Sequence, residues 1–284
     1  MKEKREYRTG GEILVDQLMI QGVNFAYCVP GESYLAVLDA LYETDIKLIT
    51  CRNEGGASMM AESYGKLTNR PGICFVTRGP GLMNALAGIH VAQQDSTPLI
   101  VFVGQIERKM RGRDAFQEVD YRTLLSDHVK WVTEIDDPAR IPELIGRAFH
   151  IATSGRAGPV VIALPEDMLT TAVLTDNSIK IEPIAISPSH NDMARFEHLL
   201  STAICPVMIL GGSNWDEASV ARIEDFAAHN QLPTAVSFRR QMLFSTEHEA
   251  FIGDVGLGIN PYLCERIKEA DLIILLGGRF GEVP

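Results

Sequence analysis

Short apolar runs alternate with helix-like segments along the first half of the chain, and this alternation limits the folds available to it. The segments between the runs place apolar residues at helical spacing. The runs are apolar at nearly every position, which is typical of strands buried on both faces. They span residues 23–29, 46–51, 72–77, 98–104 and 158–167. We therefore predict an α/β fold whose parallel sheet is covered by helices on both faces.

Two segments interrupt the alternation. Residues 105–137 are polar and charged with weak periodicity, so we expect a long functional segment without a clear element. Residues 175–192 are polar, contain proline and lack periodicity, as linkers do.

The alternation resumes beyond the linker. It includes apolar runs at 205–212, 232–238 and 270–280, the last of which ends four residues before the end of the sequence. The sequence thus predicts two successive doubly wound parallel-sheet domains, 1–180 and 181–284. We expect the second domain to be truncated, because no helix follows its last apolar run.

Composition excludes several classes of protein. A formal net charge of −11 argues against a nucleic-acid binder, which needs a basic face. No apolar run is long enough to span a membrane, and the charged start is not a secretory signal. The five cysteines are scattered without a CxxC pair. We expect reduced thiols in a cytoplasmic protein without a nucleic-acid or membrane partner.

Glycines follow three of the predicted strands. They occur in Pro30-Gly31, in Glu54-Gly55-Gly56 and in Gly79-Pro80-Gly81. The carboxyl ends of parallel strands meet at one edge of a sheet, where ligands bind. Glycine allows a ligand to approach the backbone closely. None of the three is a P-loop or a G-x-G-x-x-G fingerprint, and the carboxylate of Glu54 is either solvated or in contact with a ligand.

Four motifs occur in order along this part of the chain. They are R-x-E-x-x-A at 52–57, T-x-G-P-G at 77–81, D-S-x-P-L at 95–99 and F-Q-E at 116–118. With them, residues 9–170 resemble the pyrimidine-binding domain of thiamine diphosphate-dependent enzymes, and most of all the acetolactate synthase group. Residues 190–284 resemble the central domain of that family more loosely.

The resemblance assigns Glu54 a role. In this family the glutamate after the second strand hydrogen-bonds N1′ of the aminopyrimidine ring of the cofactor and so promotes loss of the proton at C2 of the thiazolium ring. Such a carboxyl group must hold or share a proton, and an apolar pocket raises a carboxyl pKa in that direction. We therefore predict Glu54 to be the catalytic residue of this chain.

The resemblance implies further site residues and partners. Pro30, Gly31, Thr77, Gly79 and Gly81 are expected to approach the pyrimidine ring. Phe116 and Gln117 are expected on the substrate side, with Lys130 near the channel; its alternative is a surface lysine. His90, Gln94 and Gln105 are further pocket candidates. The substrate is a small 2-oxo acid, and the family places the cofactor between two chains, so a homodimer or homotetramer is expected.

A stripe of small residues marks the helix after Glu54. Ala57, Ala61 and Gly65 share one face and allow close helix packing. We predict a dimer interface along this helix, and a core contact within the chain is the alternative.

The sequence departs from the family in several places. The family binds the diphosphate and Mg²⁺ through a Gly-Asp-Gly signature in a carboxyl-terminal domain, and this chain has none. We expect no metal ligands here, no activity of this chain alone, and a missing domain or a separate diphosphate-binding subunit. FAD is an additional candidate cofactor, because residues 237–240 and 253–258 occupy the region that binds it in some members, although they do not match the expected flavin pattern.

The departures leave the substrate open. Asn53 and Arg78 stand where acetolactate synthases have histidine and serine. The preferred function is decarboxylation of a 2-oxo acid, first of all pyruvate, with transfer or release of the two-carbon unit. Related alternatives are an oxalyl-coenzyme A decarboxylase and a pyruvate oxidase. An alternative of another class is a non-catalytic subunit that binds a nucleotide or FAD and regulates a complete homologue.

Overall fold

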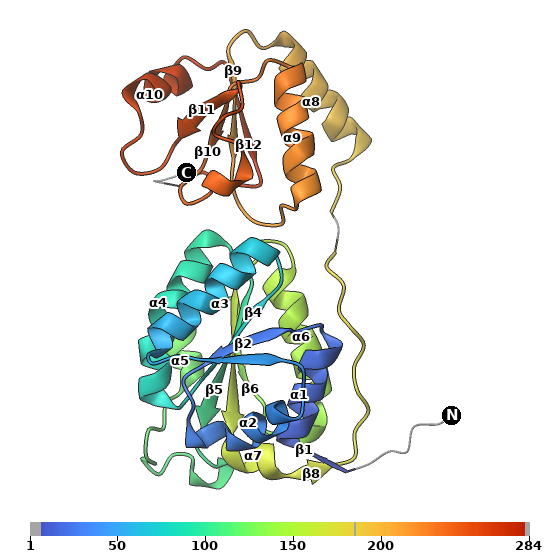
Figure 1. The fold of residues 1–284 in the computed structure, drawn as a ribbon, viewed down its shortest axis with the longest axis vertical. Coiled ribbons are helices and arrows are strands. Elements are labelled where there is room, and N and C mark those ends of the chain that lie inside the picture. The colour runs from blue at the N-terminus through green and yellow to red at the C-terminus, as the bar shows by residue number, and fades with distance from the viewer. Residues whose placement is uncertain (1–6, 185, 282–284) are drawn as a thin grey trace, which may run out of the picture. The chain divides into compact units, whose positions relative to one another are not determined.

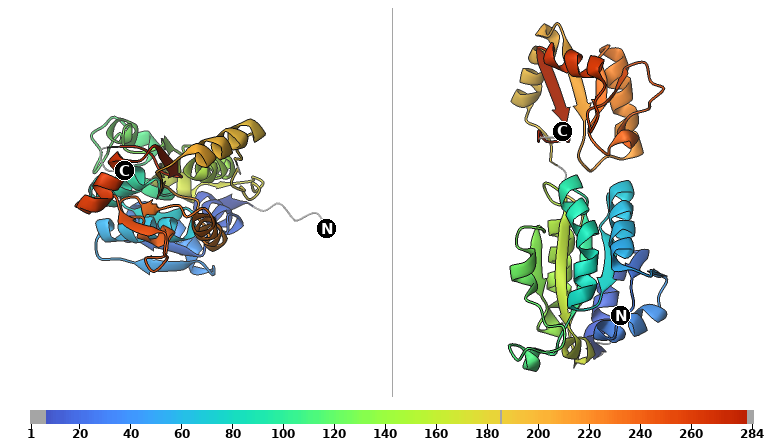
Figure 2. Two further views of the ribbon diagram at one scale, coloured as in Figure 1. Left: turned by 90° about the horizontal axis from the view of Figure 1, so that it is seen from above. Right: turned by 90° about the vertical axis from the view of Figure 1, so that its left-hand side faces the viewer.

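The structure is a computed structural model that describes residues 7–184 and 186–281. The chain divides into unit 1, residues 1–184, and unit 2, residues 185–284. Each unit contains its own parallel sheet with helices on both faces (Figures 1 and 2). The predicted α/β fold with two successive parallel sheets is therefore confirmed. The predicted domain boundary after residue 180 lies just before the division.

The main sheet of unit 1 contains six parallel strands in the order β3-β2-β4-β5-β7-β6. The first and second apolar runs lie at one side of the sheet, and the longest strands lie near its middle. The strands are β2 (Phe25–Cys28), β3 (Lys47–Thr50), β4 (Gly72–Val76), β5 (Leu99–Gln105), β6 (Trp131–Glu134) and β7 (Pro159–Pro165).

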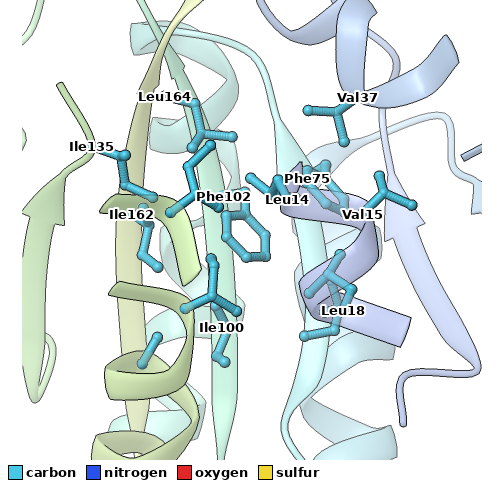
Figure 3. Packing of buried hydrophobic residues seen from close by; sticks show 14 of the residues in the cluster. Leu14, Val15, Leu18, Val37, Phe75, Ile100, Phe102, Ile135, Ile162 and Leu164 are labelled. Atoms are coloured by element: carbon cyan, nitrogen blue, oxygen red, sulfur yellow. The ribbon is translucent and has the colours of Figure 1, made fainter. Parts of the chain in front are cut away.

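Helices bury both faces of this sheet. Ile100 and Phe102 of β5 point into a core beneath α1, α2 and α6 (Figure 3), whereas Leu99, Val101 and Val103 point into the core beneath α3 and α4. A strand with cores on both sides must be apolar at every position, which explains the continuous runs. The helices are α1 (Gly10–Ile20), α2 (Leu35–Tyr42), α3 (Glu54–Thr68), α4 (Gly79–Asp95), α5 (Tyr121–Leu125), α6 (Ile141–Thr153) and α7 (Glu166–Thr170).

The polar segment 105–137 is more ordered than predicted. It contains the short helix α5 and strand β6, which closes one side of the sheet by pairing with β7 alone. All four residues of β6 are only half-buried. An edge strand this short carries no continuous apolar run, so the expectation of no clear element was wrong for these residues.

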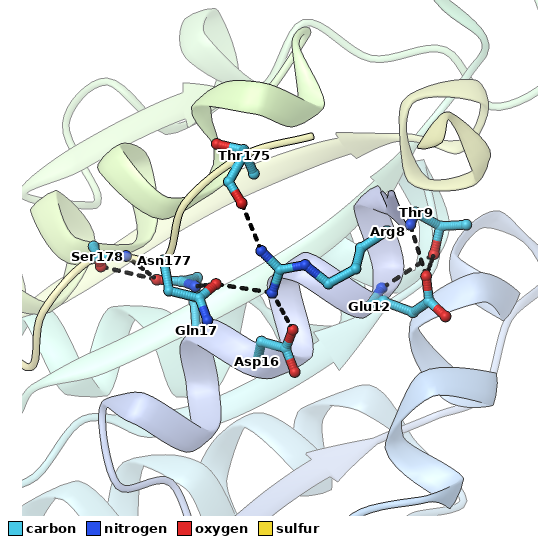
Figure 4. A network of polar contacts seen from close by, with 8 residues as sticks. All are labelled: Arg8, Thr9, Glu12, Asp16, Gln17, Thr175, Asn177 and Ser178. Atoms are coloured by element: carbon cyan, nitrogen blue, oxygen red, sulfur yellow. Dashed lines mark hydrogen bonds and ion pairs between the residues drawn. The ribbon is translucent and has the colours of Figure 1, made fainter. Parts of the chain in front are cut away.

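The predicted linker begins as part of unit 1. Strand β8 (Ala172–Val173) pairs antiparallel with β1 (Arg8–Thr9). The chain beyond β8 then follows α1, where the buried amide of Gln17 accepts from Ser178 N at 3.1 Å and donates to Asn177 Oδ1 at 2.7 Å. Arg8 adds bonds to Asp16 and to the carbonyl of Thr175 (Figure 4). These polar contacts fix the first half of the linker against α1.

The small stripe of α3 faces the interior of its own chain. Ala57 and Ala61 have no exposed surface. A Cβ atom on Gly65 would lie 2.3 Å from the carbonyl oxygen of Pro98, at the start of β5. The stripe therefore makes the core contact within the chain that was the alternative, and a dimer interface along the helix stays a prediction. Small side chains on a helix allow close packing against the same chain or against a partner chain, and the sequence does not distinguish the two.

Replacing Gly65 with alanine is expected to destabilise unit 1 by about 1–3 kcal/mol, because the added methyl group has to displace backbone at the start of β5. Gly56 in the same helix has no atom within 4 Å of a built Cβ. Gly56→Ala is therefore the matched control, and it should leave the stability unchanged or raise it by up to about 1 kcal/mol. Urea unfolding measures both changes. Equal stability of the two variants would contradict the close packing of α3.

Unit 2 contains a four-stranded parallel sheet in the order β11-β10-β9-β12. Helices α8 and α9 contribute to the core on one face and α10 to the core on the other. The three predicted strands are present, and β11 and the helices α8 and α10 were not predicted. The elements are α8 (His190–Thr202), β9 (Pro206–Leu210), α9 (Glu217–His229), β10 (Thr234–Val236), β11 (Phe251–Asp254), α10 (Pro261–Lys268) and β12 (Leu272–Leu276).

Candidate active site

Glu54 is the first residue of α3, four residues beyond the end of β3. Asn53 caps this helix, since its Oδ1 accepts from the backbone N–H of Gly55 at 2.8 Å. Gly55 and Gly56 form the first turn of this helix. An acidic side chain at a helix N-terminus is stabilised by the free N–H groups there. The capped turn therefore fixes the backbone from which the Glu54 carboxylate projects.

The Glu54 carboxylate is half-buried and held by a neighbouring helix. Its Oε2 accepts from Nδ2 of Asn84 on α4 at 3.0 Å. Its Oε1 lies 3.5 Å from where a Cβ atom on Gly81 would stand. Asn84 was not among the predicted site residues. A signal was present, because Asn84 follows Gly81 by three residues, and residues three apart in a helix share a face.

The segment after β2 packs directly against the segment after β4. A Cβ atom on Gly31 would lie 2.6 Å from Cβ of Thr77, so only glycine fits. Ser33 Oγ and Thr77 Oγ1 share a hydrogen bond of 3.1 Å. Pro30 lies beside this contact and is exposed. The structure thus brings Pro30, Gly31 and Thr77 together at the carboxyl edge of the sheet.

Gly79 and Gly81 belong to the first turn of α4, where the prediction had only a glycine turn. Both are buried. The hydroxyl of Tyr121 accepts from Gly79 N and donates to the carbonyl of Gly104, each at 3.0 Å. Burial raises the pKa of Tyr121 to about 12, which keeps its hydroxyl protonated and able to donate. Tyr121 was missed because it lies in the aperiodic segment, and it anchors the start of α4 to β5.

The F-Q-E segment lies next to Gly79. Gln117 has φ of +64°, and its carbonyl oxygen would be 3.3 Å from a Cβ atom on Gly79. Phe116 projects outward with 76 % of its surface exposed. Glu118 accepts from the backbone N–H groups of Gly112 and Ala115, which lower its pKa. The segment therefore forms a folded loop that presents Phe116 beside the first turn of α4.

A cavity of about 750 Å³ opens beside this loop, between it and strands β5, β6 and β7. Gln105 lines it, and its Nε2 donates to the carbonyl of Val119 at 2.9 Å. Charged groups of both signs line the remainder, including the ion pair between Arg111 and Glu134. Gln105 therefore lies at the predicted edge of the sheet, where its amide supports the F-Q-E loop.

Three predicted residues lie elsewhere. Lys130 precedes β6, at the opposite, amino edge of the sheet, where its Nζ donates to the carbonyls of Ile151 and Ser154. Its burial lowers its pKa. His90 is exposed in the second half of α4 and stacks edge-on with His128 at 6.3 Å, and Gln94 is exposed in the last turn. In this chain these three residues are not part of the site around Glu54.

Residues 237–240 and 253–258, the candidate FAD region, lie at the carboxyl edge of the sheet of unit 2. Ser237 and Arg240 follow β10 and are buried, and Nη2 of Arg240 is 3.4 Å from Oγ of Ser213. Residues 253–258 span the end of β11 and the turn beyond it. Nothing in these contacts tests flavin binding, which stays a prediction.

Within 7–184 and 186–281, no group of three or more His, Cys, Asp or Glu side chains is placed to hold a metal ion. Over the same residues, no helix has the length and apolar character needed to cross a membrane.

Comparison with known families gives two matches. The family model of the thiamine pyrophosphate enzyme N-terminal TPP binding domain matches residues 8–124. The family model of the thiamine pyrophosphate enzyme central domain matches residues 193–284.

Comparison with curated proteins gives relatives over nearly the whole chain. The mitochondrial acetolactate synthase catalytic subunit of Aspergillus candidus is 34% identical over 97% of this chain and 42% of its own length. Acetolactate synthase isozyme 1 and isozyme 2 large subunits of Escherichia coli are 33% and 30% identical, over 98% and 96% of this chain and 50% of their own lengths. The chain spans about half the length of the curated relatives it matches.

Proposed function

Because the chain belongs to the thiamine pyrophosphate enzyme family, we propose that it forms the pyrimidine-binding part of an enzyme that decarboxylates a 2-oxo acid, first of all pyruvate. The two-carbon unit is then transferred, as in acetolactate synthesis, or released. The observation that carries this proposal is the Glu54 carboxylate at the start of α3, fixed by Asn84 and adjoining a backbone cradle of glycines.

The residues around Glu54 fit a flat heteroaromatic ring. A Cβ atom on Gly81 would stand 2.8 Å from Cγ2 of Thr77 and 3.5 Å from Glu54 Oε1. The absence of that atom lets the first turn of α4 pack closely on Thr77, beside the carboxylate. A Cβ atom on Gly31 would meet Thr77, just before α4, and one on Gly79, in the first turn of α4, would meet Gln117. This cradle is the part of unit 1 that we propose to contact thiamine diphosphate.

Glu54 would hold a proton between its free oxygen and N1′ of the ring. Asn84 occupies Oε2 as a donor, so Oε1 is the oxygen left for this bond. When bound, thiamine diphosphate supplies the carbon nucleophile that attacks a 2-oxo acid. We propose that Phe116 and Gln117, in the loop next to Gly79, border the substrate.

The remaining parts of the site are proposed to lie outside residues 1–284. The diphosphate and its Mg²⁺ need oxygen ligands, and the described residues contain no cluster that would supply them. This chain is therefore proposed to be inactive by itself. The missing groups come from further sequence or from a separate subunit.

A second copy of the chain is the proposed partner. The outward faces of α3 and α4 expose Met59, Met60 and Met83, each more than a third exposed, next to a Glu54 that is only half-buried. Covering these side chains in a homodimer or homotetramer would also remove Glu54 from water. We propose a cytoplasmic location.

A turnover assay tests the function. The protein, in the form in which its source makes it, is mixed with thiamine diphosphate, Mg²⁺ and pyruvate, and CO₂ and acetolactate are measured. Release of both, dependent on added thiamine diphosphate, is the expected result. CO₂ without acetolactate would identify a decarboxylase. No reaction with pyruvate, other 2-oxo acids or oxalyl-coenzyme A would contradict the proposal and favour the regulatory subunit, which the named relatives do not support.

A further inference from the structure

Arg78 occupies the variable position of the T-x-G-P-G motif, between Thr77 and Gly79. Its side chain is 8% exposed. Its Nη1 donates to Oε2 of Glu166 at 2.9 Å, and its Nη2 forms an ion pair with Glu32. Its Nε finds no hydrogen-bond partner among the residues that the structure describes. A cation is thus buried at the edge of the sheet where Glu54 lies.

The two carboxylates come from other strand ends. Glu32 follows Gly31 directly, at the start of a short 3₁₀ turn after β2. Glu166 is the first residue of α7, directly after β7. Arg78 itself precedes α4, after β4. Since the sheet order is β2-β4-β5-β7 in this region, one guanidinium connects segments across four neighbouring strands.

The shape of the guanidinium matters for this connection. Two different nitrogens reach two different carboxylates, which a planar fork with several donors can do and a single ammonium group does less well. The carboxylates are more exposed than the arginine, at 61% for Glu32 and 36% for Glu166. Burying a cation in an ion pair seldom adds stability compared with apolar packing. Its presence here points to a role in geometry.

Two of the connected segments form the glycine cradle. Gly31 touches Thr77, and the backbone N–H of Gly81 donates to the carbonyl of Arg78 at 2.8 Å. Gly81 adjoins Glu54, and Asn84, one turn further along α4, holds the Glu54 carboxylate. Displacement of Arg78 would therefore shift both the Gly31 backbone and the start of α4.

We propose that Arg78 is a positioning residue: it holds the Pro30–Gly31 backbone and the first turn of α4 at the spacing that the Glu54 site requires. The inference rests on the proposed function for its catalytic consequence. Its structural part, the fixing of two segments by one guanidinium, is independent of any cofactor.

The first test uses the cofactor-free chain and measures amide hydrogen–deuterium exchange. Arg78→Gln should speed exchange in residues 31–34 and 79–82 by about tenfold, because local opening no longer breaks two ion pairs. Strand β5 should exchange as in the wild type. Arg78→Lys should give a smaller increase. Arg140→Gln is the matched control, since it removes only an exposed pair with Glu143.

The second test uses the cofactor-loaded protein as its source makes it. Arg78→Gln should lower kcat by about 100-fold, as small misplacements of catalytic groups do, with KM for the 2-oxo acid near the wild-type value. Arg78→Lys should recover part of kcat. Unchanged exchange in both segments, or an equal increase in β5, would overturn the proposal, as would a wild-type kcat.

Two further variants keep the proposal testable if Arg78→Gln does not fold. Glu32→Gln should loosen residues 31–34 alone, and Glu166→Gln should loosen the start of α7; no change in either would overturn the connection. Glu54→Gln is measured beside them. Unchanged turnover in Glu54→Gln with loosened segments in Arg78→Gln would reject the proposed function and leave the structural role. If Glu54→Gln loses turnover while Arg78→Gln keeps the wild-type turnover and exchange rates, the proposed function stands and the positioning role of Arg78 is rejected.

Discussion

Glu54→Gln is expected to slow hydrogen exchange at C2 of bound thiamine diphosphate by about 10²–10⁴-fold, the contribution typical of a positioned acid–base group. The glutamine amide has nearly the size of the carboxyl group and can keep the contact with Asn84. It cannot take up or give back a proton, however, so the step at N1′ loses its proton donor.

The measurement follows deuterium loss at C2 in the cofactor-loaded protein, with thiamine diphosphate binding measured separately. Glu43→Gln, at an exposed position after α2, is the control and should exchange as the wild type does. Asn84→Ala should give an intermediate loss, since it leaves the carboxyl group but removes the 3.0 Å bond that orients it. Exchange in Glu54→Gln at the wild-type rate, with the cofactor bound, would contradict the assignment.

The features that could be predicted from the sequence are those with a local signature. Continuous apolar runs identify strands buried on both faces, and both parallel sheets are present. The motif around Glu54 led to the thiamine diphosphate family, which the family models confirm. The glycines were predicted to let a ligand approach the backbone, which stays a prediction, whereas Gly31 and Gly81 lie against neighbouring segments of the chain.

The features that were missed depend on contacts between distant parts of the chain. Arg78 meets Glu32 and Glu166 from 46 and 88 residues away, and no periodicity encodes such a pairing. The resemblance placed Lys130 near the channel, and β6 was not predicted. Once Lys130 is seen to precede that strand, its place at the amino edge follows, because all strands of the sheet are parallel.

The helices α3 and α4 are joined at both ends, which links the stability of unit 1 to its site. At the carboxyl edge of the sheet, Asn84 holds Glu54. At the amino edge, Nζ of Lys66 on α3 lies 2.5 Å from Oδ2 of Asp95, the last residue of α4, and 3.1 Å from Oε1 of Glu62. Loss of the second contact should therefore affect both the fold and the alignment of the first.

Lys66→Met is expected to destabilise unit 1 by about 3–5 kcal/mol, the usual result of removing one partner from a buried ion pair. The side chains of Glu62 and Asp95 are only 4% and 7% exposed. After the substitution, Glu62 keeps the bond of 2.9 Å from Thr97 Oγ1 but loses its cation. Two buried carboxylates would then face each other without the charge that compensates them.

Urea unfolding with linear extrapolation measures this loss. Lys180→Met is the matched control, because it makes the same substitution in an exposed pair with Glu182, 56% and 72% exposed, and should change stability by less than about 0.5 kcal/mol. Glu62→Gln added to Lys66→Met should recover part of the loss by removing one of the two charges. Equal stability of Lys66→Met and Lys180→Met would show that the buried cluster does not hold α3 to α4, and the Glu54–Asn84 contact would then have to align the helices by itself.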